Sequence, residues 1–170
     1  SGPARYIFLA GGYPGTNGGP ATDKVWRYDA IGNSYIDMPP LPAPRASGAV
    51  VIDSNHKLHY VGGLGSDRSA DVATHYTLDL LNPSAQWQTL ATPMPIARNH
   101  VQGLQIGPSL IYFGGGQHTH DPNYLVTYQT VSHTFNINTQ TWTRIADAPA
   151  PRSHAETSTV LVNGKYLQFG

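Results

Sequence analysis

The sequence predicts an all-β fold built by repetition of a small unit. Short apolar runs that end in glycine recur along the 170-residue chain, at residues 7–12, 58–63, 110–115 and 166–170. The first three close on Gly11-Gly12, Gly62-Gly63 and Gly114-Gly115, and a period of about 50 residues is typical of arrays of supersecondary units. The remaining apolar runs are rich in Val, Ile, Tyr, Thr and Leu and are bounded by Gly, Pro, Asn and Asp, as strands are. No segment keeps a helical period long enough to predict a helix.

The same features follow each glycine pair in the same order. A polar loop leads to a second strand-like run that ends in Asp or Asn, at residues 26–29, 76–79 and 133–136. An aromatic residue follows, at Tyr35, Trp87 and Trp142. A proline-rich turn then carries Pro-x-x-Arg in every copy, at 42–45, 95–98 and 149–152. Behind each arginine a further apolar stretch, such as 48–52 or 159–162, leads to the next glycine-ending run.

Four strands in about 50 residues make one small sheet, and such sheets stacked radially form a β-propeller. If the strands of a blade are lettered a to d from the axis outward, the chain reads b, c, d, then a to d twice, then a and b. Glycine after the b strand fits a backbone that needs positive φ or lies close to a neighbouring blade. The recurrent Trp or Tyr is expected to fill the gap between blades.

These repeated positions resemble the kelch repeat, whose signature is a strand ending in Gly-Gly, a downstream tyrosine, a tryptophan near the end of the unit and an arginine that opens the next. The resemblance covers essentially the whole chain, and the first unit departs from it by having Tyr35 where tryptophan is expected. It implies that residues 1–170 are a partial kelch-type β-propeller, similar in architecture to the central propeller of galactose oxidases. We expect about three four-stranded antiparallel blades plus part of a further blade. The repeat periods run approximately over residues 7–57, 58–109 and 110–165, and the next begins at 166–170.

The predicted blades do not close a ring, because propellers have about four to eight blades. We therefore expect apolar blade faces that need a partner. The remaining blades of a longer chain are the favoured partner. Other copies of the chain, assembled into a ring, are the alternative, since exposed blade faces and edge strands invite association.

Composition excludes several classes of function. Charged residues make up 12% of the chain, and 10 Lys and Arg balance 10 Asp and Glu. Nucleic-acid binding is not expected, because it needs a basic patch, and no apolar run is long enough to span a membrane. The absence of cysteine rules out disulfides and thiol chemistry in this chain. Low charge and abundant Gly, Pro, Asn, Thr and Tyr favour an extracellular or cell-surface protein.

The sharpest cluster of candidate metal ligands follows the third glycine pair. On an extended segment His118 and His120 would point the same way, and Asp121 comes directly after them. Two imidazoles and a carboxylate suit a divalent transition metal such as zinc or copper. A solvated polar loop with two surface histidines is the alternative. No other cofactor is predicted.

A second candidate site follows the repeat. The arginines of the Pro-x-x-Arg turns, expected on the channel side, are Arg45, Arg98 and Arg152. His100 and His154 stand two residues behind the second and third of these, where the first copy has Ser47. The kelch resemblance places this connection near the mouth of the central channel, where Arg and His could bind an acidic peptide or a carboxylated sugar. The structural alternative, which the recurrence favours, is that these side chains link adjacent loops through backbone carbonyls.

The sequence favours a non-catalytic interaction module that binds a protein or glycan through loops on a rigid propeller. The expected contact loops are residues 13–23, which include Tyr13, 64–71 and 117–124. The resemblance also implies two enzyme alternatives. One is a galactose-oxidase-like enzyme, whose radical cofactor needs a tyrosine linked to a cysteine that this chain lacks, and the other is a sialic-acid epimerase. A third alternative is a structural protein that assembles through its open blade faces.

No catalytic residue is predicted. The glycine-rich segment 11–19 lacks the lysine and the helix that phosphate binding needs, and the chain has no Gly-x-Ser-x-Gly nucleophile motif.

Overall fold

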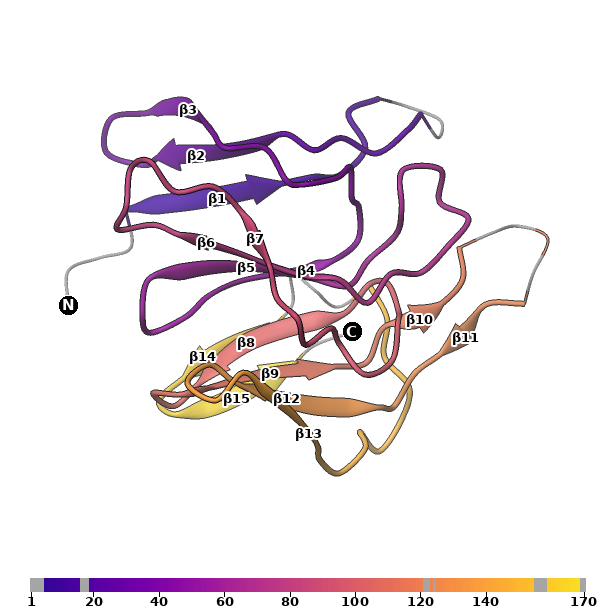
Figure 1. The fold of residues 1–170 in the computed structure, drawn as a ribbon. Helices are drawn as coiled ribbons and strands as arrows, with labels where there is room; N and C mark the ends of the chain where they lie inside the picture. The colour runs from indigo at the N-terminus through magenta and orange to yellow at the C-terminus, as the bar shows by residue number, and fades with distance from the viewer. Residues whose placement is uncertain (1–4, 16–18, 121–122, 124, 155–158, 169–170) are drawn as a thin grey trace.

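The computed structural model describes residues 5–15, 19–120, 123, 125–154 and 159–168, and all their regular elements are β-strands (Figure 1). The first sheet has the order β1 (Tyr6–Ala10), β2 (Val25–Asp29), β3 (Ser34–Met38). The second has the order β4 (Ala49–Ile52), β5 (Lys57–Val61), β6 (His75–Asp79), β7 (Gln88–Thr89). The third has the order β8 (Gln102–Ile106), β9 (Leu110–Gly114), β12 (Ser132–Asn136), β13 (Thr141–Arg144). Two further pairs are β10 (Gln117–His118) with β11 (Thr127–Tyr128), and β14 (Thr159–Val162) with β15 (Lys165–Gln168).

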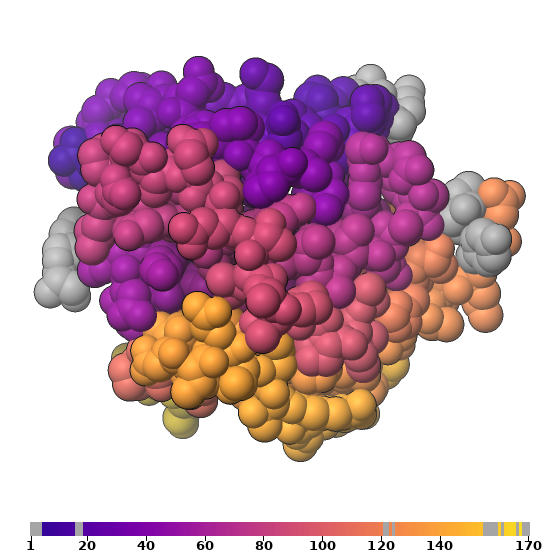
Figure 2. Space-filling model, in the orientation of Figure 1, coloured from indigo at the N-terminus to yellow at the C-terminus, as the bar shows by residue number. Residues whose placement is uncertain are grey.

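The strand order confirms the predicted sequence of b, c, d, then a to d twice, then a and b. All pairings are antiparallel, and each of the three larger sheets is one blade. β8 lies beside both β4 and β14, so the first strands of successive blades are neighbours, as the inner strands of a propeller are. The blades pack side by side through the molecule (Figure 2). No helix in the described part of the chain is long and apolar enough to cross a membrane.

The long connections after β1, β5 and β9 emerge at one end of the strands, on the right of Figure 1. The connections from the last strand of one blade to the first strand of the next lie at the same end. We call this the loop end. The short turns after β2, β4, β6, β8 and β12 lie at the opposite end.

The glycine pairs link the second strand of each blade to the arginine turn that follows it. The pairs with positive φ are Gly11 and Gly12 (67° and 94°), Gly62 and Gly63 (69° and 94°), and Gly115 and Gly116 (60° and 93°). The third pair therefore lies one residue later than the sequence indicated, because Gly114 is the last residue of β9. The second N–H of each pair donates to an arginine carbonyl: Gly12 to Arg45 at 2.8 Å, Gly63 to Arg98 at 3.0 Å and Gly116 to Arg152 at 2.7 Å. Glycine is needed here because the backbone is left-handed and contacts the next turn closely.

An apolar seam joins the first blade to the second. Its buried members, which define the first seam, are Val25, Leu41, Leu58, Tyr60, Tyr76, Leu78 and Trp87. Trp87 fills the gap between the blades, as predicted, and its indole N–H donates to the Pro39 carbonyl at 2.8 Å. Tyr35, which replaces tryptophan in the first repeat, is 61% exposed and packs on Tyr28 with ring centroids 4.8 Å apart.

The second seam joins the second blade to the third and contains polar groups as well. Its buried apolar members are Ala49, Val51, Val61, Met94, Val101, Ile111, Phe113 and Phe135. Trp142 lies in this seam as Trp87 lies in the first, and its indole N–H donates to the Thr92 carbonyl at 3.1 Å. The side chains of His59, His75 and Arg98 are buried in the same seam.

Candidate functional site

The loop end is one connected surface, because the loops of successive blades are bonded to one another. Ala21, after β1, donates its N–H to the carbonyl of Ser66, after β5, at 2.9 Å. Asp71 joins the second loop to the third, since its Oδ2 accepts the N–H of Thr119 at 2.9 Å. Its Oδ1 accepts the side-chain amide of Asn99 at 2.5 Å. The described residues of the three contact loops predicted from the sequence, 13–15, 19–23, 64–71, 117–120 and 123, thus lie at this end.

Tyr13 takes part in the contact between the first two loops. The guanidinium of Arg68 lies over its ring, 3.7 Å from the centroid, in a cation–π arrangement. Burial raises the pKa of the Tyr13 hydroxyl. The ring therefore holds two loops together as well as forming part of the surface.

The three repeat arginines differ in accessibility. Arg45 donates to the hydroxyl of Tyr76 in the next blade at 2.9 Å and to the Pro44 carbonyl at 2.8 Å. Arg98 is 0% exposed, donates to the Val131 carbonyl at 3.4 Å, and has its pKa lowered to about 10 by burial. Arg152 is exposed and donates to the carbonyl of its neighbour.

A buried Arg98 cannot line a channel or touch a ligand, so that prediction is corrected. Its place between blades 2 and 3 fits the structural alternative of linking loops through carbonyls.

His100 and His154 come together at the loop end. Both have a left-handed backbone, with φ of 51° and 58°, and Ser47 at the same repeat position has φ of 55°. The N–H of His100 donates to the Ser47 carbonyl at 2.8 Å. The imidazole rings of His100 and His154 stack with centroids 3.8 Å apart and planes 26° apart. The recurrence in sequence therefore becomes direct contact between successive blades.

His120 joins this pair, whereas His118 does not. The rings of His120 and His100 have centroids 5.4 Å apart, and one ligand atom from each of His100, His120 and His154 lies within 4.8 Å of the others. Nδ1 of His118 instead lies 3.3 Å from Asp71 Oδ2. The expectation that His118 and His120 point the same way assumed an extended segment, but Thr119 between them has φ of 59°. Asp121, the third predicted ligand, lies outside the described residues.

Asp53, His59 and His75 form a hydrogen-bonded chain inside the second seam. Nε2 of His59 lies 3.1 Å from Asp53 Oδ2, and its Nδ1 lies 2.7 Å from Nε2 of His75. Because an ionised carboxylate only accepts, His59 donates from Nε2 and accepts at Nδ1, so His75 donates from its own Nε2. Burial lowers the pKa of both imidazoles, that of His75 to about 3. Both rings are therefore neutral near pH 7.

The sites predicted from the sequence were all in loops and turns, and they did not include this hydrogen-bonded network of Asp53, His59 and His75. A signal was present in the repeat alignment. His59 is the third residue of its b strand and His75 the first of its c strand, where the first blade has Phe8 and Val25. Two polar residues at positions that are apolar in another copy indicate a buried polar pair.

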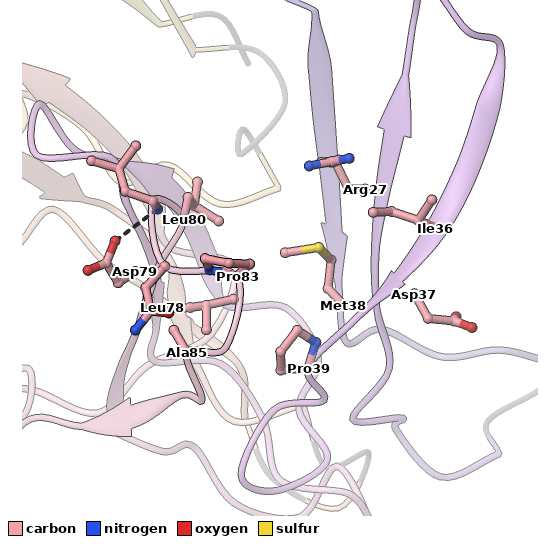
Figure 3. A pocket seen from close by; sticks show the side chains of 12 residues that line it. Arg27, Ile36, Asp37, Met38, Pro39, Leu78, Asp79, Leu80, Pro83 and Ala85 are labelled. Carbon is pink, nitrogen blue, oxygen red and sulfur yellow. Dashed lines mark hydrogen bonds between the residues drawn. The ribbon is translucent and has the colours of Figure 1, made fainter.

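A groove of about 310 Å³ lies between β3 and the turn after β6. Met38 and Pro39 line one wall, and Leu78, Leu80 and Pro83 line the other (Figure 3). Its lining includes neither a histidine nor a residue of the loops after the glycine pairs. The groove is thus separate from the loop-end residues.

Comparison with known proteins identifies relatives with the same repeat. The chain is 31% identical over 149 residues to the Kelch-like protein terF of Aspergillus terreus, covering 85% of this chain and 31% of that protein. It is 24% identical over 177 residues to a Kelch repeat-containing protein of Arabidopsis thaliana, covering 98% and 41% respectively. The solved structure of YjhT superposes with a TM-score of 0.73 at 17% identity, over 88% of this chain and 45% of that one. The chain is a kelch-repeat protein.

The kelch-repeat chain also resembles the N-acetylneuraminate epimerase of Haemophilus influenzae, at 29% identity over 122 residues, or 71% of this chain and 29% of that protein. No family model matches the chain. It spans 31%, 41% and 29% of the lengths of these three curated relatives. The likeness to YjhT establishes the fold, and the kelch relatives suggest a propeller interaction module.

Proposed function

We propose that this kelch-repeat chain is a non-catalytic interaction module that binds a protein or a glycan at its loop end. The observation that carries the proposal is the bonding of loops from three successive blades to one another, through Ala21 to Ser66 and Asp71 to Thr119. Loops tied in this way lose little conformational freedom on binding, so more of the contact free energy appears as affinity. A rigid scaffold with loops at one end is a common arrangement for recognition.

The exposed side chains at the loop end have the chemistry of a recognition surface. Tyr128, Arg152 and His154 line a shallow depression of about 270 Å³. Leu125, on the same loop as Tyr128, is also exposed. Tyrosine and arginine are enriched among the residues that contribute most to binding, and both can contact a peptide or a sugar ring. On composition, we place this recognition outside the cell or at its surface.

The test begins with a screen of the immobilised chain against a glycan array and a peptide library, followed by calorimetric titration of the best ligand. Tyr128→Ala and Arg152→Ala each remove an exposed side chain from the depression. We expect each to weaken binding at least about tenfold, which is about 1.4 kcal/mol. Tyr35→Ala is the matched control, because Tyr35 is an exposed tyrosine on the outer strand of the first blade. We expect it to bind like the unmodified chain.

Two results would contradict this proposal. One is a screen in which no glycan or peptide binds above background. The other is a ligand whose affinity is unchanged by both loop-end variants and lost in Tyr35→Ala.

A second candidate is an N-acetylneuraminate epimerase-like activity, which the similarity to the Haemophilus influenzae enzyme favours. It is tested by adding the purified chain to N-acetylneuraminate and following the ratio of epimers by NMR. A rate above that of the buffer, lost in Arg152→Ala, would support the enzyme. A rate equal to that of the buffer would favour the binding module over the enzyme.

A further inference from the structure

We infer that His100, His120 and His154 form a binding site for a divalent transition metal ion such as Zn²⁺. The site does not depend on whether the loop end also binds a protein or a glycan. Its three imidazoles come from three different connections: His100 between β7 and β8, His120 between β10 and β11, and His154 between β13 and β14. The site therefore brings together a loop of the third blade and the two connections that flank that blade.

The spacing of the ligand atoms suits one ion. One nitrogen from each ring lies within 4.8 Å of the others. Zinc binds histidine nitrogen at about 2.0–2.1 Å in tetrahedral geometry, which separates bound nitrogens by about 3.4 Å. Metal binding therefore requires the side chains to rotate so that the three nitrogens come closer together. Three protein ligands leave the fourth tetrahedral position for water or a ligand group.

The backbone holds two of the rings toward each other. His100 and His154 occupy the same repeat position, and both are left-handed. The hydrogen bond from the His100 N–H to the Ser47 carbonyl fixes the turn that carries the first ring. The turn that carries His154 is fixed by the hydrogen bond from the Gly116 N–H to the carbonyl of Arg152, two residues before His154.

A hydrogen-bonded shell orients His154 for metal binding. Ser153 Oγ donates to Gln117 Oε1 at 2.7 Å and lies 3.0 Å from Nδ1 of His154. A hydroxyl has a single proton to donate, so Oγ accepts from His154, whose proton is then on Nδ1. With the proton on Nδ1, Nε2 is the nitrogen that would coordinate a metal, and fixing the tautomer in this way is the role that such outer contacts have in known metal sites.

The same shell reaches the loop of His120. Gln117 is buried, and its Nε2 donates to the Thr119 carbonyl at 3.1 Å. The N–H of Thr119 donates to Asp71. Both backbone groups of the residue before His120 are thus fixed. The donor set of three imidazoles suits Zn²⁺, Cu²⁺, Ni²⁺ or Co²⁺ and is poorly suited to Ca²⁺ or Mg²⁺, which prefer oxygen.

The test is calorimetric titration of the metal-free chain with zinc chloride, with the visible absorption of Co²⁺ as a second readout of coordination. Three variants remove one ligand each: His100→Ser, His154→Ser and His120→Ala. Serine is chosen at the left-handed positions because Ser47 already occupies the equivalent place. We expect one ion per chain for the unmodified protein and at least a tenfold loss of affinity in each variant. Circular dichroism and thermal unfolding without metal verify that each variant is folded.

Two further variants sharpen the assignment. His56→Asn alters an exposed histidine in the turn after β4, at the opposite end, and keeps a residue that tolerates its φ of 61°. His118→Gln alters the neighbouring histidine that contacts Asp71. We expect both to bind Zn²⁺ with unchanged stoichiometry. The inference is overturned if the unmodified chain binds no Zn²⁺, if folded His100→Ser and His154→Ser bind as well as the parent, or if His118→Gln alone abolishes binding.

Discussion

Six of the eight histidines of this chain form two groups with opposite surroundings. Those buried in the second seam are His59, His75 and His133, and those that meet at the loop end are His100, His120 and His154. In the seam, Asp53 accepts from His59, which accepts from His75, so both nitrogens of His59 and Nε2 of His75 are occupied by hydrogen bonds within the protein. At the loop end the rings face one another close to solvent. Burial, rather than residue type, therefore separates the histidines that pack between blades from the histidines that can bind a ligand or a metal ion.

The two seams between blades also differ in the polarity of their side chains. The first seam closes with apolar and tyrosine side chains, whereas the second adds imidazoles and the guanidinium of Arg98. Burial lowers the pKa of His59 and His75 in the second seam, so the unfolded chain takes up protons that the folded chain does not. We therefore expect the second seam to depend on pH and the first seam to depend on it less.

The largest expected effect comes from removing an aromatic ring that packs on the buried histidines. Phe135 is buried, and its ring centroid lies 4.5 Å from that of His75 and 5.0 Å from that of Trp142. Phe135→Ala should lower the free energy of unfolding by about 3–5 kcal/mol, because it leaves a cavity. Urea denaturation measures it, with Tyr35→Ala as the exposed control, expected within about 0.5 kcal/mol of the parent. A loss below about 1 kcal/mol for Phe135→Ala would mean that the second seam is not a packed core.

Two glycine variants at the loop end distinguish the cost of a left-handed backbone from the cost of a steric clash. Gly12 and Gly116 have φ of 94° and 93°. A Cβ at Gly12 has no atom within 4 Å, whereas one at Gly116 would lie 2.5 Å from the Asn99 carbonyl oxygen. Gly12→Ala should cost about 1–2 kcal/mol for the left-handed backbone alone. Gly116→Ala should cost about 1–3 kcal/mol more, because the loop must move.

The same denaturation experiment measures this pair, and zinc titration adds a second readout. Gly116→Ala should also weaken Zn²⁺ binding, since Gln117 follows it directly. Equal losses of stability in the two variants would count against the close contact at Asn99.

Stability should fall as the pH is lowered, through the buried histidines. Burial depresses the pKa of folded His75 to about 3, while the unfolded side chain takes up a proton below about pH 6.5. The unfolded state therefore binds more protons between these values, and stability present above pH 6.5 is lost on acidification. For His75 the loss at pH 5 relative to pH 8 is about 2 kcal/mol. Urea denaturation at a series of pH values measures it.

A double variant connects this pH dependence to the seam. His59→Phe with His75→Val places in the second blade the residues that the first blade has at Phe8 and Val25. It should remove the part of the dependence that His59 and His75 contribute and leave the part from His133, whose pKa burial lowers to about 4. A pH dependence unchanged in the double variant would assign the effect to other groups.

The smallest expected effects distinguish two arginines at the same repeat position. Arg98 is fully buried, and burial lowers its pKa. Arg98→Met should be neutral or stabilising, because it replaces a desolvated charge by an apolar chain of similar length. Arg45→Met should cost about 1 kcal/mol, since it removes the hydrogen bond to Tyr76. Thermal unfolding compares the two, and a large loss in Arg98→Met would show that its charge is needed in the seam.

The repeat made the architecture predictable from the sequence. Strand order, left-handed glycines and the tryptophans between blades follow from recurring positions, although the first copy has the exposed Tyr35 in place of tryptophan and the third glycine pair lies one residue later than predicted. The sites were less predictable because they depend on single departures from the repeat. Thr119 is left-handed, which turns His120 toward His100, and no sequence rule predicts this for threonine. The burial of Arg98 depends on how two blades pack and has no signal in its own turn.

A long-range ¹H–¹⁵N NMR spectrum of the histidine rings, recorded with and without Zn²⁺, tests directly whether the loop-end histidines bind metal while the seam histidines do not. It observes both groups of histidines in one sample and reports the tautomer of each ring. We predict that the resonances of His100, His120 and His154 shift with one equivalent of Zn²⁺. The rings of His59 and His75 should keep the Nε2–H tautomer. Shifts of the seam histidines, or of His118 in place of His100 and His154, would contradict the division between scaffold and binding residues.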